Sequence, residues 1–113
     1  MDKYELVANF SQELRRGTLV LCVLADLKAP TYGYGLIEKL SHTGISIEAN
    51  TLYPLLRRLE DQGLLASTWN TDGAKPRKYY DLTDFGNEVL GELNEYWHNT
   101  VQSMNEILEG ADS

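Results

Sequence analysis

The stretch ANTLYPLLRRLEDQG, residues 49–63, organises the rest of the chain. Its leucines recur at the spacing of successive helical turns, so they form one stripe that can face a core. They are Leu52, Leu55, Leu56 and Leu59. The opposite side of this helix carries Asn50, Tyr53, Pro54, Arg57 and Asp61, with Thr51 and Arg58 at its flanks. An outer face of this kind suits a groove in nucleic acid, although the segment alone favours an ordinary surface helix.

Length and composition indicate a single small domain, or a small domain with an accessory helix. The chain has 113 residues, of which 42% are hydrophobic. No apolar run approaches the ~20 residues needed to cross a bilayer, and the N-terminus lacks the pattern of a signal peptide. The single cysteine, Cys22, has no partner for an internal disulfide, so we expect a cytoplasmic location.

The net charge of −7 argues at first against binding to DNA, but the charges are unevenly distributed. All ten Lys and Arg residues lie between Lys3 and Lys78. The segment from Tyr79 onward contains only acidic charges: Asp81, Asp84, Glu88, Glu92, Glu95, Glu106, Glu109 and Asp112. A chain of this kind can keep its anionic end away from phosphate while local cations face it. The acidic segment can also simply confer solubility.

Two helices are expected before the opening stretch. The first runs from about residue 11 to residue 28 and ends before Pro30, with Gly17 as a weak interior point. Its run 19–24 is apolar on all sides, which indicates burial and contact with a second chain through Leu21. A buried strand is the alternative for that run, but the length of the segment favours a helix. The second helix runs from about residue 32 to residue 41, and Gly44 is a candidate left-handed cap.

The start and the middle of the third helix are irregular. Ser46 is a plausible N-cap, although Glu48, a poorer capping residue, lies closer to the expected start. Pro54 lies beyond the first turn, where proline removes a backbone donor and costs about 3 kcal/mol. Such exceptions are typical of places where shape serves a function. Helix, short turn and helix within about thirty residues is the outline of a helix-turn-helix, whose second helix reads DNA.

A two-stranded hairpin is predicted after Gly63. Residues 64–69 and 77–82 read as strands, and Asp72-Gly73 between them is a strong turn signal. The tip is expected to carry Lys75, Arg77 and Lys78, which can neutralise phosphates. A basic hairpin can also be only a solvated turn. After a helix-turn-helix, however, it matches the wing of a winged helix.

The last predicted helix is long and carries an unusually extended apolar stripe. Thr83 is expected to cap it, with Asp84 in its first turn. The stripe consists of Leu90, Leu93, Trp97, Val101, Met104 and Leu108. A domain of this size cannot bury the whole stripe. We therefore expect these residues, with Leu21, to form the contact of a two-fold homodimer that binds a palindromic site. The fold class expected is mainly α (α+β), with a DNA-binding part at 1–82 and a dimerisation helix at 83–113.

Several motifs together resemble those of the PadR family of transcriptional regulators, in particular its short, multidrug-sensing members. They are Tyr32-Gly33-Tyr34-Gly35-Leu36, the segment 51–60, Gly63-Leu64-Leu65 and the segment 77–86. The resemblance implies a homodimeric winged helix-turn-helix, usually a repressor, whose first and last helices form the dimer. It also implies release from DNA when a small aromatic or amphipathic compound binds. Gly35 departs from the family pattern, which usually has an acidic residue there, as does Glu48, where a smaller Ser would be more usual.

The resemblance assigns roles to individual residues. Thr51, Tyr53 and Pro54 match the recognition-helix signature, Arg57 and Arg58 the basic pair, and Lys75, Arg77 and Lys78 the wing. With Asn50, which the helical wheel places outward, these are the expected DNA-binding residues. Tyr96 and Trp97 match the place where related regulators stack an aromatic side chain on flat ligands, although Trp97 can instead be dimer core. Arg15 and Arg16 can touch phosphate or pair with the acidic last helix.

Other function classes fit the sequence less well. His42 and His98 are isolated, and no nucleophile–base pair or Gly-rich phosphate loop is present, so we expect no enzyme activity and no cofactor. One cysteine and two distant histidines cannot form a metal site. The remaining alternative is a winged helix that contacts another protein through its acidic last helix without binding DNA. The basic wing argues against this alternative.

Overall fold

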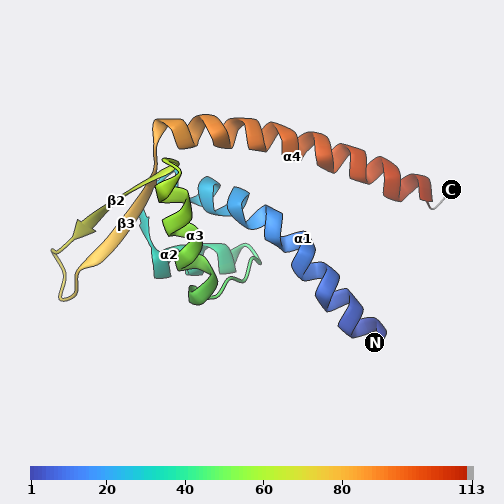
Figure 1. The fold of residues 1–113 in the computed structure, drawn as a ribbon, viewed down its shortest axis with the longest axis horizontal. Coiled ribbons are helices and arrows are strands. Elements are labelled where there is room, and N and C mark those ends of the chain that lie inside the picture. The colour runs from blue at the N-terminus through green and yellow to red at the C-terminus, as the bar shows by residue number, and fades with distance from the viewer. Residues whose placement is uncertain (112–113) are drawn as a thin grey trace.

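The computed structural model of the chain describes residues 1–111 and contains four helices and three strands. Asp112 and Ser113, which the sequence assigns to the dimerisation helix, lie outside the described residues. The elements are α1 (Lys3–Asp26), β1 (Thr31–Tyr32), α2 (Gly33–His42), α3 (Ala49–Asp61), β2 (Leu65–Asn70), β3 (Arg77–Leu82) and α4 (Asp84–Ala111). This order and arrangement is a winged helix, as predicted. Figure 1 shows the β2–β3 hairpin at one end of the molecule, while α1 and α4 project toward the other.

The core is built mainly from leucines that α1, α2 and α3 bring together. Leu52, Leu56 and Leu59 of the opening stretch are fully or almost fully buried, and Leu55 is half-buried. The predicted stripe is therefore confirmed. The other buried apolar side chains are Val23, Leu24, Leu27, Leu36, Leu40, Ile47, Leu64, Leu65, Tyr80 and Leu90. Burial of each leucine contributes about 2 kcal/mol to folding. No helix among residues 1–111 is both long enough and apolar enough to cross a membrane.

The first helix begins earlier than the sequence predicted. α1 starts at Lys3, because Asp2 is its N-cap and accepts a 2.8 Å hydrogen bond from the Glu5 amide. The predicted start near residue 11 was therefore wrong. The added turns carry exposed apolar side chains, among them Val7 and Phe10, so burial in the core of this chain does not mark them as helical.

The helices α2 and α3 end in the same way, on a glycine in the left-handed region. Gly44 has φ +88° and Gly63 has φ +81°. After each glycine, the next amide donates back to the last turn, Ile45 to Leu40 and Leu64 to Leu59. This is the Schellman motif, which satisfies carbonyl groups that the helix end leaves unpaired. The predicted cap at Gly44 is confirmed, and Gly63 ends α3 before the hairpin that the sequence predicts after it.

The start of α3 lacks a side-chain cap. Glu48 occupies the N-cap position and its side chain makes no capping hydrogen bond, so Ser46 is not the cap. The helix continues through Pro54 to Asp61 without a break. The stability of α3 therefore comes from its buried leucine face rather than from its ends.

The sheet has three antiparallel strands in the order β1-β3-β2, one strand more than the predicted two-stranded wing. β1 pairs Thr31 with Tyr80 and Tyr32 with Tyr79. Two residues next to Pro30 are too short a segment for an alternating pattern, so the sequence did not reveal this strand. The β2–β3 hairpin pairs Leu65 with Leu82 at its base and Asn70 with Arg77 near its tip.

Thr83 and Gly86 join the start of α4 to the base of the hairpin. The Thr83 hydroxyl accepts a 2.9 Å hydrogen bond from the Gly86 amide, as a cap does, and donates to the Gly63 carbonyl at 2.7 Å. The predicted cap is therefore confirmed. A Cβ at Gly86 would lie 2.1 Å from the Leu64 carbonyl oxygen, so this approach of helix to strand requires glycine. These contacts fix the direction in which α4 leaves the domain.

Candidate nucleic-acid interface

The outer face of α3 is open to solvent over most of its length. Asn50, Thr51, Pro54, Arg57 and Arg58 are all exposed. Because the leucine face is fixed in the core, these side chains must point away from it. A 13-residue helix with two exposed arginines and an exposed amide can enter the major groove and reach base edges and phosphates.

Tyr53 differs from its neighbours on α3 because its ring is half-buried against α2. A Cβ at Gly33 would lie 2.4 Å from the Tyr53 hydroxyl oxygen, so the absence of a side chain at Gly33 makes room for the ring. Burial raises the pKa of the Tyr53 phenol, and Tyr34 and Tyr80 add to this rise. The phenol is therefore uncharged at neutral pH and adds no negative charge to this surface.

The sequence predicted that all three wing cations lie at the hairpin tip, but they occupy two different elements. Lys75 lies exposed in the connecting loop, whereas Arg77 and Lys78 are the first two residues of β3. The Arg77 guanidinium lies 4.5 Å from the centre of the Tyr32 ring, and Tyr32 in turn packs on Tyr79. Lys78 is turned toward α3, where its Nζ lies 3.7 Å from a carboxylate oxygen of Glu60.

An open groove of about 600 Å³ runs between the wing and the outer side of α2 and α3. It brings Tyr53 of α3 next to Lys75 and Arg77 of the wing, so α3 and the hairpin share one surface. It also contains Tyr34 and Trp69, two exposed aromatic residues that the sequence reasoning did not select. The sequence does contain an indication that Trp69 is exposed, because this tryptophan lies in a polar strand next to a basic turn.

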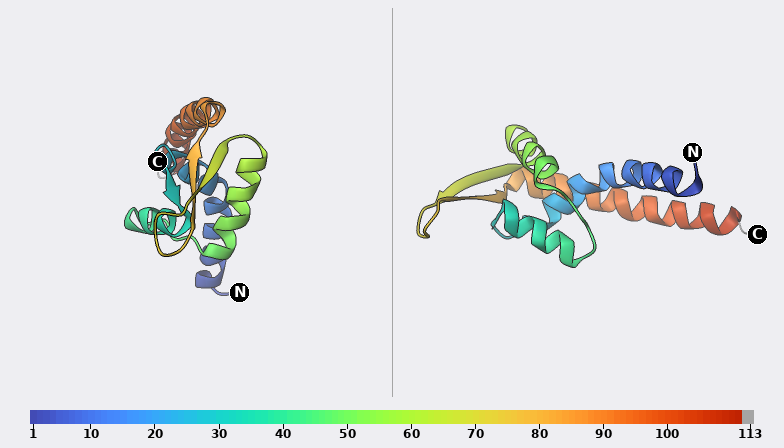
Figure 2. Two further views of the ribbon diagram at one scale, coloured as in Figure 1. Left: turned by 90° about the vertical axis from the view of Figure 1, so that its left-hand side faces the viewer. Right: turned by 90° about the horizontal axis from the view of Figure 1, so that it is seen from below.

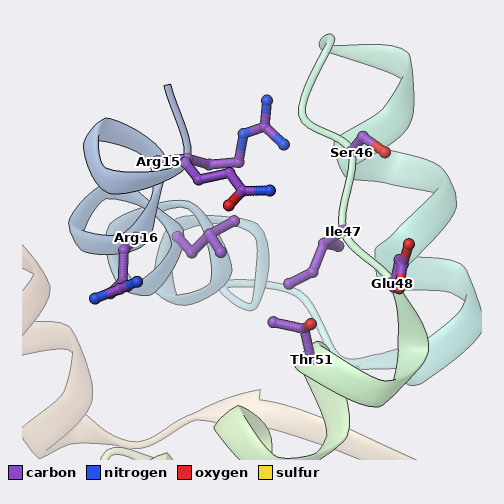
Figure 3. Close-up of a pocket in the computed structure, with 8 residues that line it drawn as sticks. Arg15, Arg16, Ser46, Ile47, Glu48 and Thr51 are labelled. Atoms are coloured by element: carbon purple, nitrogen blue, oxygen red, sulfur yellow. The ribbon is translucent and has the colours of Figure 1, made fainter. Parts of the chain in front are cut away.

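A second groove, of about 430 Å³, lies between α1 and the loop that leads into α3. Figure 3 shows the Arg15 side chain extended toward Ser46, while Arg16 points away from this loop. Thr51, in the first turn of α3, lines the same groove. Arg15 therefore places a positive charge in the groove next to the start of α3. Arg15 and Arg16, for which the same roles were expected, point in different directions.

The family relationship agrees with this geometry. The sequence profile of the transcriptional regulator PadR-like family matches residues 20–92, which include α2, α3 and the whole hairpin. The chain belongs to the PadR family. It is a transcriptional regulator and not an enzyme, and membership of this family implies DNA binding.

Several transcriptional regulators are similar to this chain in structure or in sequence. A PadR family transcriptional regulator from Eggerthella lenta is 54% identical, with a TM-score of 0.87 over 93% of this chain and 94% of that chain. A PadR-like transcription factor from Bacteroides fragilis is 39% identical, with a TM-score of 0.72 over 88% and 98% of the two chains. A transcriptional regulator of Mycobacterium tuberculosis is 38% identical over 61 residues, which cover 54% of this chain and 57% of that protein.

This PadR-family chain has a second surface, on its long helices, that is apolar and open. A groove of about 480 Å³ lies between α1 and α4 and is lined by Leu14, Leu21, Leu93, Tyr96 and Trp97. The exposed fraction is 76% for Leu14 and 41% for Trp97. Two views show α1 and α4 extending together beyond the compact part of the molecule (Figures 1 and 2).

The residues predicted for dimerisation fall into three groups in the structure. Leu93, Trp97, Met104 and Leu108 are exposed, whereas Leu21 and Val101 are half-buried within the chain. Leu90 is only 5% exposed and belongs to the core of the chain itself. The part of the predicted stripe that is exposed on this chain therefore begins at Leu93.

Proposed function

We propose that this PadR-family regulator is a repressor that binds a palindromic operator as a homodimer and is released by a small aromatic or amphipathic effector. The observation that carries the proposal is the union of α3 and the basic wing on one surface, at the opposite end of the molecule from an uncovered apolar face. Within the chain, residues 1–82 would form the DNA-binding part and residues 83–113 the dimerisation helix, with Leu90 of α4 completing the core of the first part.

The homodimer is supported by the apolar residues on α1 and α4. Val7, Phe10, Leu14 and Tyr4 are exposed on α1, and Tyr96, Trp97, Met104, Ile107 and Leu108 on α4. So many exposed large apolar side chains on two helices are unusual on a monomer and typical of a subunit interface. A two-fold axis would pair this surface with its copy and place two α3 helices on successive major grooves.

The DNA contacts would divide between base reading and phosphate binding. Arg57 and Asn50 have the donors and acceptors that recognise base edges, while the exposed Arg58, Thr51 and Lys75 would bind phosphates. Tyr53, with Pro54 on the next position of α3, would shape the face that enters the groove. The helix α4 leads away from the wing, so its acidic residues would repel DNA only weakly.

The effector would occupy the groove between α1 and α4. Tyr96 and Trp97 line it, and the acidic Glu13 lies at its edge, a combination that favours flat cationic aromatic compounds. A ligand bound there would contact both long helices and could change the separation of the two recognition helices. Titration with planar cations while tryptophan fluorescence is recorded tests this site, with Trp97→Phe as the control. An unchanged signal in both proteins would contradict it.

The DNA-binding face is tested by Arg57→Ala in a gel-shift titration against a duplex that the protein selects from a random pool. Loss of a base or phosphate contact by Arg57 should weaken binding by tenfold or more, corresponding to about 1–3 kcal/mol. Lys3→Ala is the matched control, because Lys3 is an exposed cation on the far end of α1. Equal affinity of the two variants, with unchanged thermal melts, would show that the recognition face lies elsewhere.

A further inference from the structure

Glu60, at the end of α3, makes contact with both strands of the wing. One of its carboxylate oxygens accepts a hydrogen bond from the Ser67 hydroxyl of β2. The other lies 3.7 Å from the Lys78 Nζ of β3. The side chains of Lys78 and Glu60 are only 34% and 30% exposed, so this contact is partly shielded from solvent.

The strand register explains why one carboxylate can reach both strands. Ser67 pairs with Tyr80 and Trp69 pairs with Lys78, so these four residues lie on the same face of the hairpin. Tyr80 is buried in the core, which means that this face turns toward α3. Lys78 also lies over the Tyr80 ring, with its Nζ 5.4 Å from the ring centre.

We propose that Glu60 is a positioning residue that holds the wing at a fixed angle to the recognition helix through Ser67 and Lys78. Lys78 then pairs with Glu60 of the same chain and is not a phosphate contact, in contrast to Lys75, although the Lys78 side chain also lines the open groove. This inference rests on the proposed DNA binding, because the angle matters only if helix and wing engage the same duplex. The backbone hydrogen bonds of Gly63, Leu64 and Thr83 fix the base of the hairpin. Glu60 holds the two strands at a point nearer the hairpin tip.

The direction in which DNA affinity changes in a Glu60 variant distinguishes a positioning role from simple repulsion between Glu60 and DNA. Removal of a negative charge near DNA should strengthen binding or leave it unchanged. In Glu60→Gln the amide oxygen can still accept from Ser67, but the attraction to Lys78 is lost. We expect this variant to bind a selected duplex about three- to tenfold more weakly than the wild type. Glu38→Gln is the matched control, since Glu38 is an exposed acid that lines the same groove, and it should bind as tightly as the wild type or more tightly.

The salt dependence of binding tests whether Lys78 touches phosphate. Each phosphate contact contributes about 0.9 to the slope of log affinity against log salt concentration. We expect Lys78→Met to weaken binding with an unchanged slope, whereas Lys75→Met should lower the slope by about one. A slope that falls by about one in Lys78→Met, or a Glu60→Gln protein that binds as tightly as the wild type, would overturn the inference.

Hydrogen exchange of the free protein gives a measurement that does not depend on DNA. The amides of β2 and β3 should exchange faster in Glu60→Gln than in the wild type, while those of the buried part of α1 should not change. Unchanged exchange in the hairpin would overturn the inference even if DNA binding fell. If the wild type binds no duplex, the proposed function fails, and the exchange measurement alone then decides whether Glu60 holds the wing.

Discussion

Single glycines determine where two elements of this protein can meet. Gly33 leaves room for the Tyr53 ring, and Gly86 lets α4 approach the Leu64 carbonyl oxygen. Neither glycine has a positive φ, so in each case the requirement comes from space and not from backbone conformation. The sequence alone could not distinguish these two positions from a glycine such as Gly91, which is in open space.

At the residue scale, Gly86→Ala should strongly destabilise the protein. The added Cβ would meet a backbone oxygen, which cannot rotate away, so α4 must shift and the Thr83 cap must loosen. We expect the free energy of unfolding to fall by about 2–3 kcal/mol or more. Gly91→Ala, in the same helix with nothing near its Cβ, should stabilise by about 0.5–1 kcal/mol. Urea denaturation measures both, and similar midpoints would contradict the close approach.

Cys22 should react slowly for a cysteine. Burial raises the pKa of its thiol, and the nearby Asp26 carboxylate raises it further. A raised pKa lowers the fraction of thiolate at pH 8, and the thiolate is the reactive form. We expect alkylation by iodoacetamide at pH 8 to be at least about tenfold slower in the native protein than in guanidinium. Equal rates in the two states would show that the thiol is freely accessible.

At the element scale, patterns that depend on burial were predictable and contacts between elements were not. The leucine stripe of α3 and the glycine stops at Gly44 and Gly63 follow from local rules of periodicity and backbone conformation. The short strand β1 depends on pairing with β3, which is distant in the sequence. The orientation of Lys78 toward Glu60 likewise depends on which face of the hairpin meets α3, and the charge of the side chain alone does not reveal this.

At the scale of the whole molecule, the two surfaces to which we assign functions lie at opposite ends. The molecule is 58 Å long, and Figure 1 shows the hairpin near one end and the ends of α1 and α4 near the other. Five of the ten cations lie on α3 and the hairpin, and the acidic helix α4 extends away from them; they are Arg57, Arg58, Lys75, Arg77 and Lys78. This separation resolves the apparent conflict between a net charge of −7 and nucleic-acid binding.

The proposed dimer gives a prediction at this scale. Met104→Asp would place a charge in the apolar interface, once from each subunit, and burial of an unpaired charge costs several kcal/mol. We expect this variant to be monomeric at micromolar concentration in sedimentation velocity. Gln102→Asp adds the same charge to the opposite side of α4 and should remain dimeric. A dimeric Met104→Asp protein would indicate that the chains associate through a different surface.

The most direct test of the central proposal is the stoichiometry of the protein on DNA. Sedimentation equilibrium of the wild-type chain with a duplex selected from a random pool gives the mass of the complex. Two recognition helices on one palindromic site require that the complex contain two chains of 12.8 kDa for each duplex. A complex with one chain per duplex, or a selected duplex without an inverted repeat, would contradict the account.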